Sequence, residues 1–211
     1  MDLREVELIL SEDELPPAIT AFIDEAEERI RTFQEDLKGA TIPAFVPSDF
    51  RMVYRALAAV MERNLAPGTL FCEWGSGFGV VAGLSAQIGF DAHAIEINHE
   101  LMDAAEALAA DFDYQVEFAR GTFVPDGGDE YLDQTNEFEW LSPGGADGYA
   151  FLGLEADDFD VIFAYPWPGE EIVVENLFER FGAEGALLVT YHGIEELRIR
   201  RKVGGRFSGG R

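Results

Sequence analysis

The feature that most constrains the fold is a regular alternation of strand-like and helical patterns between residues 69 and 120. The apolar runs TLFCEW, AHAIEI and YQVEFA alternate with the helical patterns GVVAGLSAQIG and HELMDAAEALAADF. Apolar strands joined by helical crossovers predict a parallel sheet with helices on both faces. The pattern resumes after residue 157 with FDVIFAY, GEEIVVENLFERFG and GALLVTYH. We therefore predict a doubly wound, mostly parallel α/β sheet of five strands, with a sixth strand in LRIRRKV.

Two amphipathic patterns precede this alternation. Apolar residues recur at helical spacing along PPAITAFIDEAEERIRTFQEDLKG, and a second helix is predicted after FVPS, with Ser48 as its N-cap. We predict a helical extension at residues 1–44 and one α/β domain at residues 45–211. Residues 121–157 are too long and too rich in Gly, Asp and aromatic residues for a plain connection. This insert is expected to be a lid or a variable decoration.

The charge balance disfavours a nucleic-acid partner. The chain has 41 acidic and 15 basic residues, a formal net charge of -26, so a polyanion is repelled over most of the surface. The acidity also fits an adaptation to salt or a solubility device. Six of the bases lie in the last 14 residues, which predicts either a solvated end or a binding patch. These six are Arg198, Arg200, Arg201, Lys202, Arg206 and Arg211.

Other composition features exclude several classes. No apolar run is long enough for a membrane span, and MDLREVELIL has acids where a signal peptide has bases, so we expect a cytoplasmic protein with no membrane partner. The single cysteine, Cys72, is expected to be a packed core thiol. His93 and His99 lie inside predicted elements and are expected to be structural. No spacing of ligand residues predicts a metal site.

The stretch FCEWGSGFG forms the turn between the first strand of the alternation and its helix. In such sheets, ligands bind at the carboxyl ends of the strands, where the strand order reverses. A dinucleotide fingerprint requires G-x-G-x-x-G/A, but its third position here is Val80. Glu73 would also lie close to a bound pyrophosphate, which like charge disfavours. A nicotinamide-dependent oxidoreductase with an atypical fingerprint remains an alternative.

A second acid accompanies this turn. Glu73, Gly75, Gly77 and Gly79 are followed by Glu96, which ends the next predicted strand 17 residues beyond Gly79. This pattern resembles that of the class I S-adenosylmethionine-dependent methyltransferases, with a Rossmann-like fold. The resemblance covers roughly residues 45–192 and implies S-adenosylmethionine as the cofactor.

The resemblance also implies roles for single residues. The turn at Glu73 handles the methionine portion, Glu96 accepts hydrogen bonds from the ribose hydroxyls, and Ile97 lies near the adenine. The family often has an acid after the third strand to bind the adenine amine, where this chain has Gly121 and Thr122. Adenine recognition is then left to backbone groups there or to a downstream acid. The chain also ends too soon for the family's usual final hairpin, so the sheet is expected to be shortened or its edge rebuilt by the tail or the N-terminal helices.

The acceptor side is predicted at FAYPWPGEE, after the fourth strand of the alternation. It is superficially similar to the D/N-P-P-aromatic motif of methyltransferases that act on base amines, but Tyr165 replaces the Asp or Asn and Trp167 breaks the proline pair. We predict Tyr165 and His192 to orient or deprotonate the acceptor and Trp167 to form an aromatic wall. The expected partner is a small-molecule or protein methyl acceptor, with a lysine or other amine as the favoured group. A neutral hydroxyl or carbon acceptor, or a non-catalytic cofactor-binding module, remains an alternative.

Overall fold

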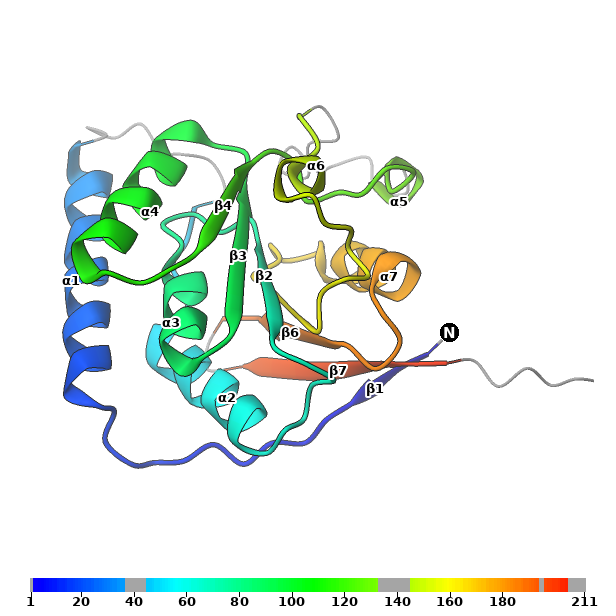
Figure 1. The fold of residues 1–211 in the computed structure, drawn as a ribbon, viewed down its shortest axis with the longest axis horizontal. Helices are drawn as coiled ribbons and strands as arrows, with labels where there is room; N and C mark the ends of the chain where they lie inside the picture. The colour runs from blue at the N-terminus through cyan, green and yellow to red at the C-terminus, as the bar shows by residue number, and fades with distance from the viewer. Residues whose placement is uncertain (1, 37–44, 133–144, 194–195, 205–211) are drawn as a thin grey trace, which may run out of the picture.

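The computed structural model describes residues 2–36, 45–132, 145–193 and 196–204, which form a mixed seven-stranded sheet between two layers of helices (Figure 1). The strand order is β1-β7-β6-β5-β2-β3-β4. β2 to β6 pair in parallel, and β7 is antiparallel to both β6 and β1. The strands are β1 (Asp2–Glu5), β2 (Leu70–Trp74), β3 (Asp91–Glu96), β4 (Glu117–Arg120), β5 (Val161–Ala164), β6 (Leu187–Tyr191) and β7 (Leu197–Val203).

The predicted doubly wound, mostly parallel sheet is confirmed, including the sixth strand in LRIRRKV. The strand at Asp2–Glu5 was not predicted, because four residues with alternating charge carry almost no strand signal. It pairs with β7, so the edge of the sheet is built by an N-terminal strand and the tail, where rebuilding by the tail or the N-terminal helices was expected. The chain runs from β2 through β3 to β4, then returns to β5 on the other side of β2. The strand order therefore reverses between β2 and β5.

Seven helices of the described residues cover the two faces of the sheet. α1 to α4 lie on one face, and α5 to α7 lie on the other (Figure 1). The helices are α1 (Pro17–Asp36), α2 (Phe50–Glu62), α3 (Val80–Ile88), α4 (His99–Phe112), α5 (Asp129–Leu132), α6 (Gly148–Leu152) and α7 (Glu171–Phe181). The α2 N-cap is Asp49, whose side chain accepts from the Met52 backbone N–H, so the prediction of Ser48 is wrong by one residue.

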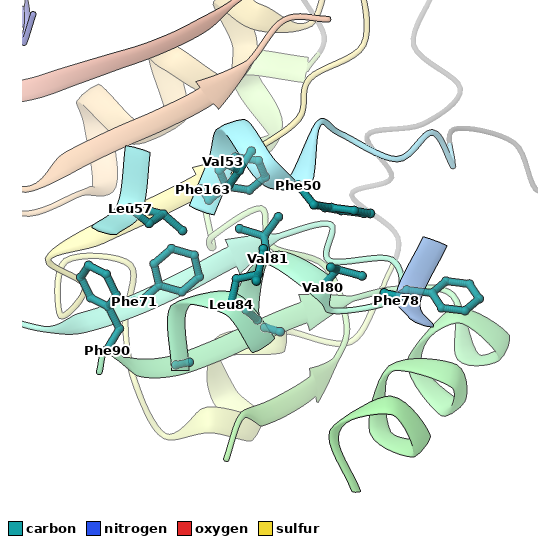
Figure 2. Close-up of a cluster of buried hydrophobic side chains, with 14 of the residues drawn as sticks. Phe50, Val53, Leu57, Phe71, Phe78, Val80, Val81, Leu84, Phe90 and Phe163 are labelled. Carbon is teal, nitrogen blue, oxygen red and sulfur yellow. The ribbon is translucent and has the colours of Figure 1, made fainter. Parts of the chain in front are cut away.

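Alternate side chains of the central strands pack into two separate hydrophobic cores, because successive side chains of a strand point to opposite faces of the sheet. Phe71 and Phe163 face the α1–α4 layer, whereas Cys72 and Ile162 face the α5–α7 layer. Figure 2 shows side chains of α2, β2, α3 and β5 meeting in the first core. Phe22 of α1 is fully buried in the same core, so the N-terminal helix packs on the α/β sheet. The domain boundary at residue 44 stays a prediction.

The basic end of the chain is structural within the described residues. Arg198 pairs with Glu196, and Arg200 pairs with Glu175. Arg201 donates to the carbonyls of Gly185 and Leu65, and the buried Lys202 ammonium donates to the Gly182 carbonyl. The interpretation as a solvated end or a free binding patch is therefore wrong for Arg200, Arg201 and Lys202, which bind β7 to other elements, whereas Arg198 forms a solvent-exposed pair within its own segment. Arg206 and Arg211 lie outside the described residues.

The insert at residues 121–157 contains α5 and α6, and its residues 133–144 lie outside the described part. None of the helices in the described ranges combines the length and apolar composition that a membrane span requires. Across the same ranges, no group of three or more His, Cys, Asp or Glu side chains is arranged to hold a metal ion.

Candidate functional site

The glycine turn joins β2 to α3 and has left-handed backbone at all three glycines. Gly75, Gly77 and Gly79 have φ values of 69°, 55° and 62°. The Gly75 and Ser76 N–H groups both donate to the Ile95 carbonyl, which ties the turn to the end of β3. Side chains are rarely accommodated at such φ values, so the conformation explains why glycine recurs at alternate positions.

Glu73 lies on β2, directly before this turn, on the face that α3 covers. Its side chain is buried, and Oε2 accepts from the Ala82 N–H in the first turn of α3 at 2.8 Å. Burial raises the pKa of the Glu73 carboxyl well above its ordinary value; the bond from Ala82 opposes the rise, and the nearby Glu96 adds to it. A positive charge placed next to Glu73 would therefore relieve the cost of ionising it.

Glu96 connects the ends of β2 and β3. Its Oε2 accepts from the Gly77 N–H at 2.7 Å, and its Oε1 accepts from the Asn98 N–H at 2.8 Å. Burial raises the pKa of this carboxyl, while these backbone bonds oppose the rise. The Ile97 N–H is a third backbone donor to this carboxyl. A carboxylate has about four acceptor positions, so the group as a whole keeps capacity for about one further donor. Ile97, the next residue, is 43% exposed.

Gly121 and Thr122 directly follow β4 and are the first two residues of the insert. The Gly121 N–H donates to the Glu96 carbonyl at 3.0 Å. The Thr122 N–H donates to the Ala146 carbonyl, and the Thr122 carbonyl accepts from Gly148. Both backbone groups of Thr122 are thus engaged within the protein. Asp147 lies between these two partners and forms an isolated parallel β-bridge with Thr122. The periodicity of the sequence did not predict this bridge.

A cavity of about 220 Å³ opens at the reversal point between β2 and β5. It is lined by Glu73 and the turn at residues 75–78, by residues 45–48 with Phe50, and by residues 165–168, together with Ile30, Val80 and Phe163. Five residues predicted for the site therefore meet here: Glu73, Gly75, Gly77, Tyr165 and Trp167. Gly79, Glu96, Ile97, Gly121, Thr122 and His192 are not among the lining residues.

The turn after β5 fixes Trp167 through its own backbone bonds. Trp167 and Glu170 bond reciprocally: the Trp167 N–H donates to Glu170 Oε2 at 3.2 Å, and the Glu170 N–H donates to the Trp167 carbonyl at 2.8 Å. Glu171 accepts from the Gly169 N–H at 2.7 Å. The prolines at 166 and 168 have no N–H, so the backbone donors of residues 166–170 are all used within this turn. Glu170 is only 3% exposed, so it does not border the site as a solvated charge.

The other predicted catalytic residues lie on β6 and after it. Tyr165 packs edge-on against Tyr191, with ring centroids 4.9 Å apart. His192 Nε2 lies 2.8 Å from the Thr190 hydroxyl. Burial lowers the pKa of His192, with Arg198 as the second cause, so the imidazole is neutral at pH 7 and able to accept a proton.

Most of the other lining residues were not predicted for the site, and two of them, Ser76 and Phe45, bear most on its chemistry. The Ser76 hydroxyl is buried, lines the cavity and has no hydrogen-bond partner among the described residues. Its position between two glycines of the turn was the available signal. Phe45 stacks on Phe78, and its ring lies 2.7 Å from where a Cβ on Gly77 would be. Phe45 and Gly77 are 32 positions apart in the chain, and no sequence pattern predicts that they meet.

Comparison with solved structures identifies the fold. A methyltransferase from Geobacter sulfurreducens superposes with a TM-score of 0.51 and 15% identity, over 90% of this chain and 92% of that chain. An RNA methyltransferase from Salinibacter ruber, in complex with S-adenosylhomocysteine, gives a TM-score of 0.51 and 15% identity over 78% of this chain and 98% of that chain. No protein-family model and no curated protein sequence matches the chain. The fold is the Rossmann-like α/β fold of class I methyltransferases.

Proposed function

We propose that the protein is an S-adenosylmethionine-dependent methyltransferase. The observation that carries this proposal is the pair of buried carboxylates, Glu73 and Glu96, on the two sides of a left-handed glycine turn at the reversal point of the sheet. Buried acids repel a pyrophosphate and favour a ligand with cationic and hydroxyl groups. S-adenosylmethionine offers a sulfonium, an ammonium and two ribose hydroxyls.

The residues present fit this cofactor. The unpartnered Ser76 hydroxyl lines the cavity beside Glu73, and the backbone of Gly75 and Gly77 presents no side chain there. In the proposal, Glu73 with the turn binds the methionine end and Glu96 binds the ribose. Ile97 contacts the adenine, and Asp147 beside Thr122 is the downstream acid for its amine. Gly79 adopts the left-handed backbone at which α3 begins. Gly121 has no side chain, which allows the Ala146 backbone to pack directly against it.

The fold comparison supports the proposal, because one of the structures with this fold was solved with S-adenosylhomocysteine, the demethylated product. The bound cofactor supplies a methyl group on a sulfonium. The chain's own contribution is to position the acceptor and keep water from the reacting atoms. Tyr165 and Trp167 line the cavity next to Glu73 and are proposed to hold the acceptor. His192 does not line the cavity, so the part proposed for it in removing the acceptor's proton is indirect, through water that can also take up the proton without it.

The proposed acceptor is an amine, on a small molecule or a protein lysine. The net charge of -26 favours approach of a cation over an anion. A neutral hydroxyl or carbon acceptor is the competing possibility, and an acceptor screen with labelled methyl donor distinguishes them.

Calorimetric titration with S-adenosylhomocysteine tests the proposed cofactor. We expect wild-type protein to bind it and Glu96→Ala to bind at least tenfold more weakly, because each hydrogen bond to a charged group contributes about 1.5–3 kcal/mol. Glu106→Ala, which removes an exposed carboxylate from α4, is the matched control and should bind normally. Equal affinity of Glu96→Ala and Glu106→Ala would remove Glu96 from the site. Binding of NADH without S-adenosylhomocysteine would instead support the oxidoreductase.

A further inference from the structure

We infer that the acceptor is a small-molecule amine with an aromatic body, bound in the cavity at the reversal point as the uncharged amine. This inference rests on the proposed methyl transfer and specifies its substrate class. It follows from the side chains that line the cavity and from the charges that are missing there.

The cavity walls are mainly aromatic and apolar. Six aromatic side chains line it. Phe45 and Phe78 stack on each other beside Gly77, in the part assigned to the cofactor, which leaves Phe50, Phe163, Tyr165 and Trp167 for the acceptor. Trp167 stands between two prolines in a turn whose backbone donors are satisfied, so the backbone position from which its side chain reaches the cavity is constrained. Aromatic pairs contribute more than the area they bury accounts for, which favours a ring over an alkyl chain of the same size.

Among the described residues, the cavity lining offers no cationic side chain to pair with an anion. None of its lining residues is Arg, Lys or His. Its polar side chains are Ser48, Glu73, Ser76 and Tyr165, and Glu73 is assigned to the cofactor. A carboxylate or phosphate on the acceptor would therefore be desolvated near a buried acid without a cation. A nucleotide or an amino acid is excluded on the same ground.

Apolar walls also decide the protonation state of the acceptor, because burial favours the uncharged form of an amine. The amine nitrogen uses its lone pair to form the new N–C bond while the C–S bond breaks, and the sulfur keeps the bonding electron pair as a thioether. The methylated ammonium then releases one proton to water. Tyr165 can accept a hydrogen bond from the amine N–H and so direct the lone pair.

The first test compares 2-phenylethylamine with phenylalanine, which adds one carboxylate, and with butylamine, which lacks the ring. Each is titrated by calorimetry into protein saturated with S-adenosylhomocysteine, and each is assayed with the methyl donor. We expect 2-phenylethylamine to bind at least tenfold more tightly than the other two. Binding of phenylalanine or butylamine with equal affinity, or no binding of 2-phenylethylamine, overturns the inference. So does preferred methylation of a lysine peptide.

Two pairs of variants locate the site. Trp167→Ala should weaken 2-phenylethylamine at least fivefold and leave S-adenosylhomocysteine within twofold, whereas Ile172→Ala changes an exposed residue of α7 outside the cavity and should alter neither. Val46→Lys places a cation on a partly exposed residue of the cavity lining and should improve phenylalanine binding at least threefold. Ile9→Lys makes the same charge change outside the cavity and should not. Equal effects within either pair count against this cavity.

The two proposals fail in different ways. If the wild-type protein does not bind S-adenosylhomocysteine, the proposed cofactor is wrong. If that binding is present but the amine series shows no aromatic or charge preference, only the inference on the acceptor fails.

Discussion

The two ends of the crevice satisfy their polar groups in different ways. At the β3 end, both oxygens of Glu96 accept backbone N–H groups, from Gly77 and Asn98, so a charged side chain is part of the turn structure. At the β5 end, the turn around Trp167 closes on itself and presents mainly apolar surface to the cavity. The first end suits recognition of one polar ligand by charge, and the second suits recognition by shape. This difference explains why a cofactor is easier to infer here than an acceptor.

The largest expected effect comes from Gly77→Val at the β3 end. A side chain at φ 55° is strained, and its Cβ would lie 2.7 Å from the Phe45 ring, in the space that the cofactor is proposed to occupy. We expect S-adenosylhomocysteine binding to fall more than 100-fold while the protein stays folded by circular dichroism. Gly153→Val is the control, because φ is 67° there and the space around its Cβ is open. If Gly77→Val binds S-adenosylhomocysteine normally, the glycines only form the turn and do not make room for the cofactor.

Glu73→Gln is expected to have an intermediate effect, with opposite signs for binding and stability. Burial raises the folded-state pKa of Glu73 above its ordinary 4.5, so the folded state holds a proton that the unfolded state releases. The group's contribution to stability is therefore present below pH 4.5 and is lost as pH rises through the raised pKa. Gln avoids this loss and should raise Tm at pH 8 but not at pH 4.5.

The expected rise is several degrees, since about 1 kcal/mol moves Tm by about 2–4 °C in a domain of this size. At the same time, S-adenosylhomocysteine should bind at least tenfold more weakly at pH 8. Thermal melts and calorimetry on one preparation measure both effects, with exposed Glu106→Gln as the control. A Tm that falls at pH 8 would show that Glu73 is bound favourably as a carboxylate in the free protein.

The smallest expected effect comes from His192→Gln at the β5 end. Because His192 contacts Thr190 and does not line the cavity, we expect kcat to fall less than threefold and its pH profile to keep its shape. The pH profile of methyl transfer to a fixed amine measures this. Loss of a limb of the profile in the variant would make His192 the general base and would give the β5 end a charged function.

The sequence predicted the parts of the fold and site that depend on local patterns. The strand and helix alternation gave β2 to β6 because apolar strands and amphipathic helices each have a fixed period. β1 was missed because its pairing with β7 joins the two ends of the chain. Glu73, Gly77 and Trp167 were placed by their positions at strand ends. Phe45 and Asp147 reach the site only through tertiary contacts, which no periodicity encodes.

The most direct test of the central claim is a calorimetric titration of the wild-type protein with S-adenosylhomocysteine and, separately, with NADH at pH 8. We expect saturable one-site binding of S-adenosylhomocysteine that Glu96→Ala loses and Glu106→Ala keeps, with no heat from NADH. Binding of NADH alone, or S-adenosylhomocysteine binding that is the same in both variants, would contradict it.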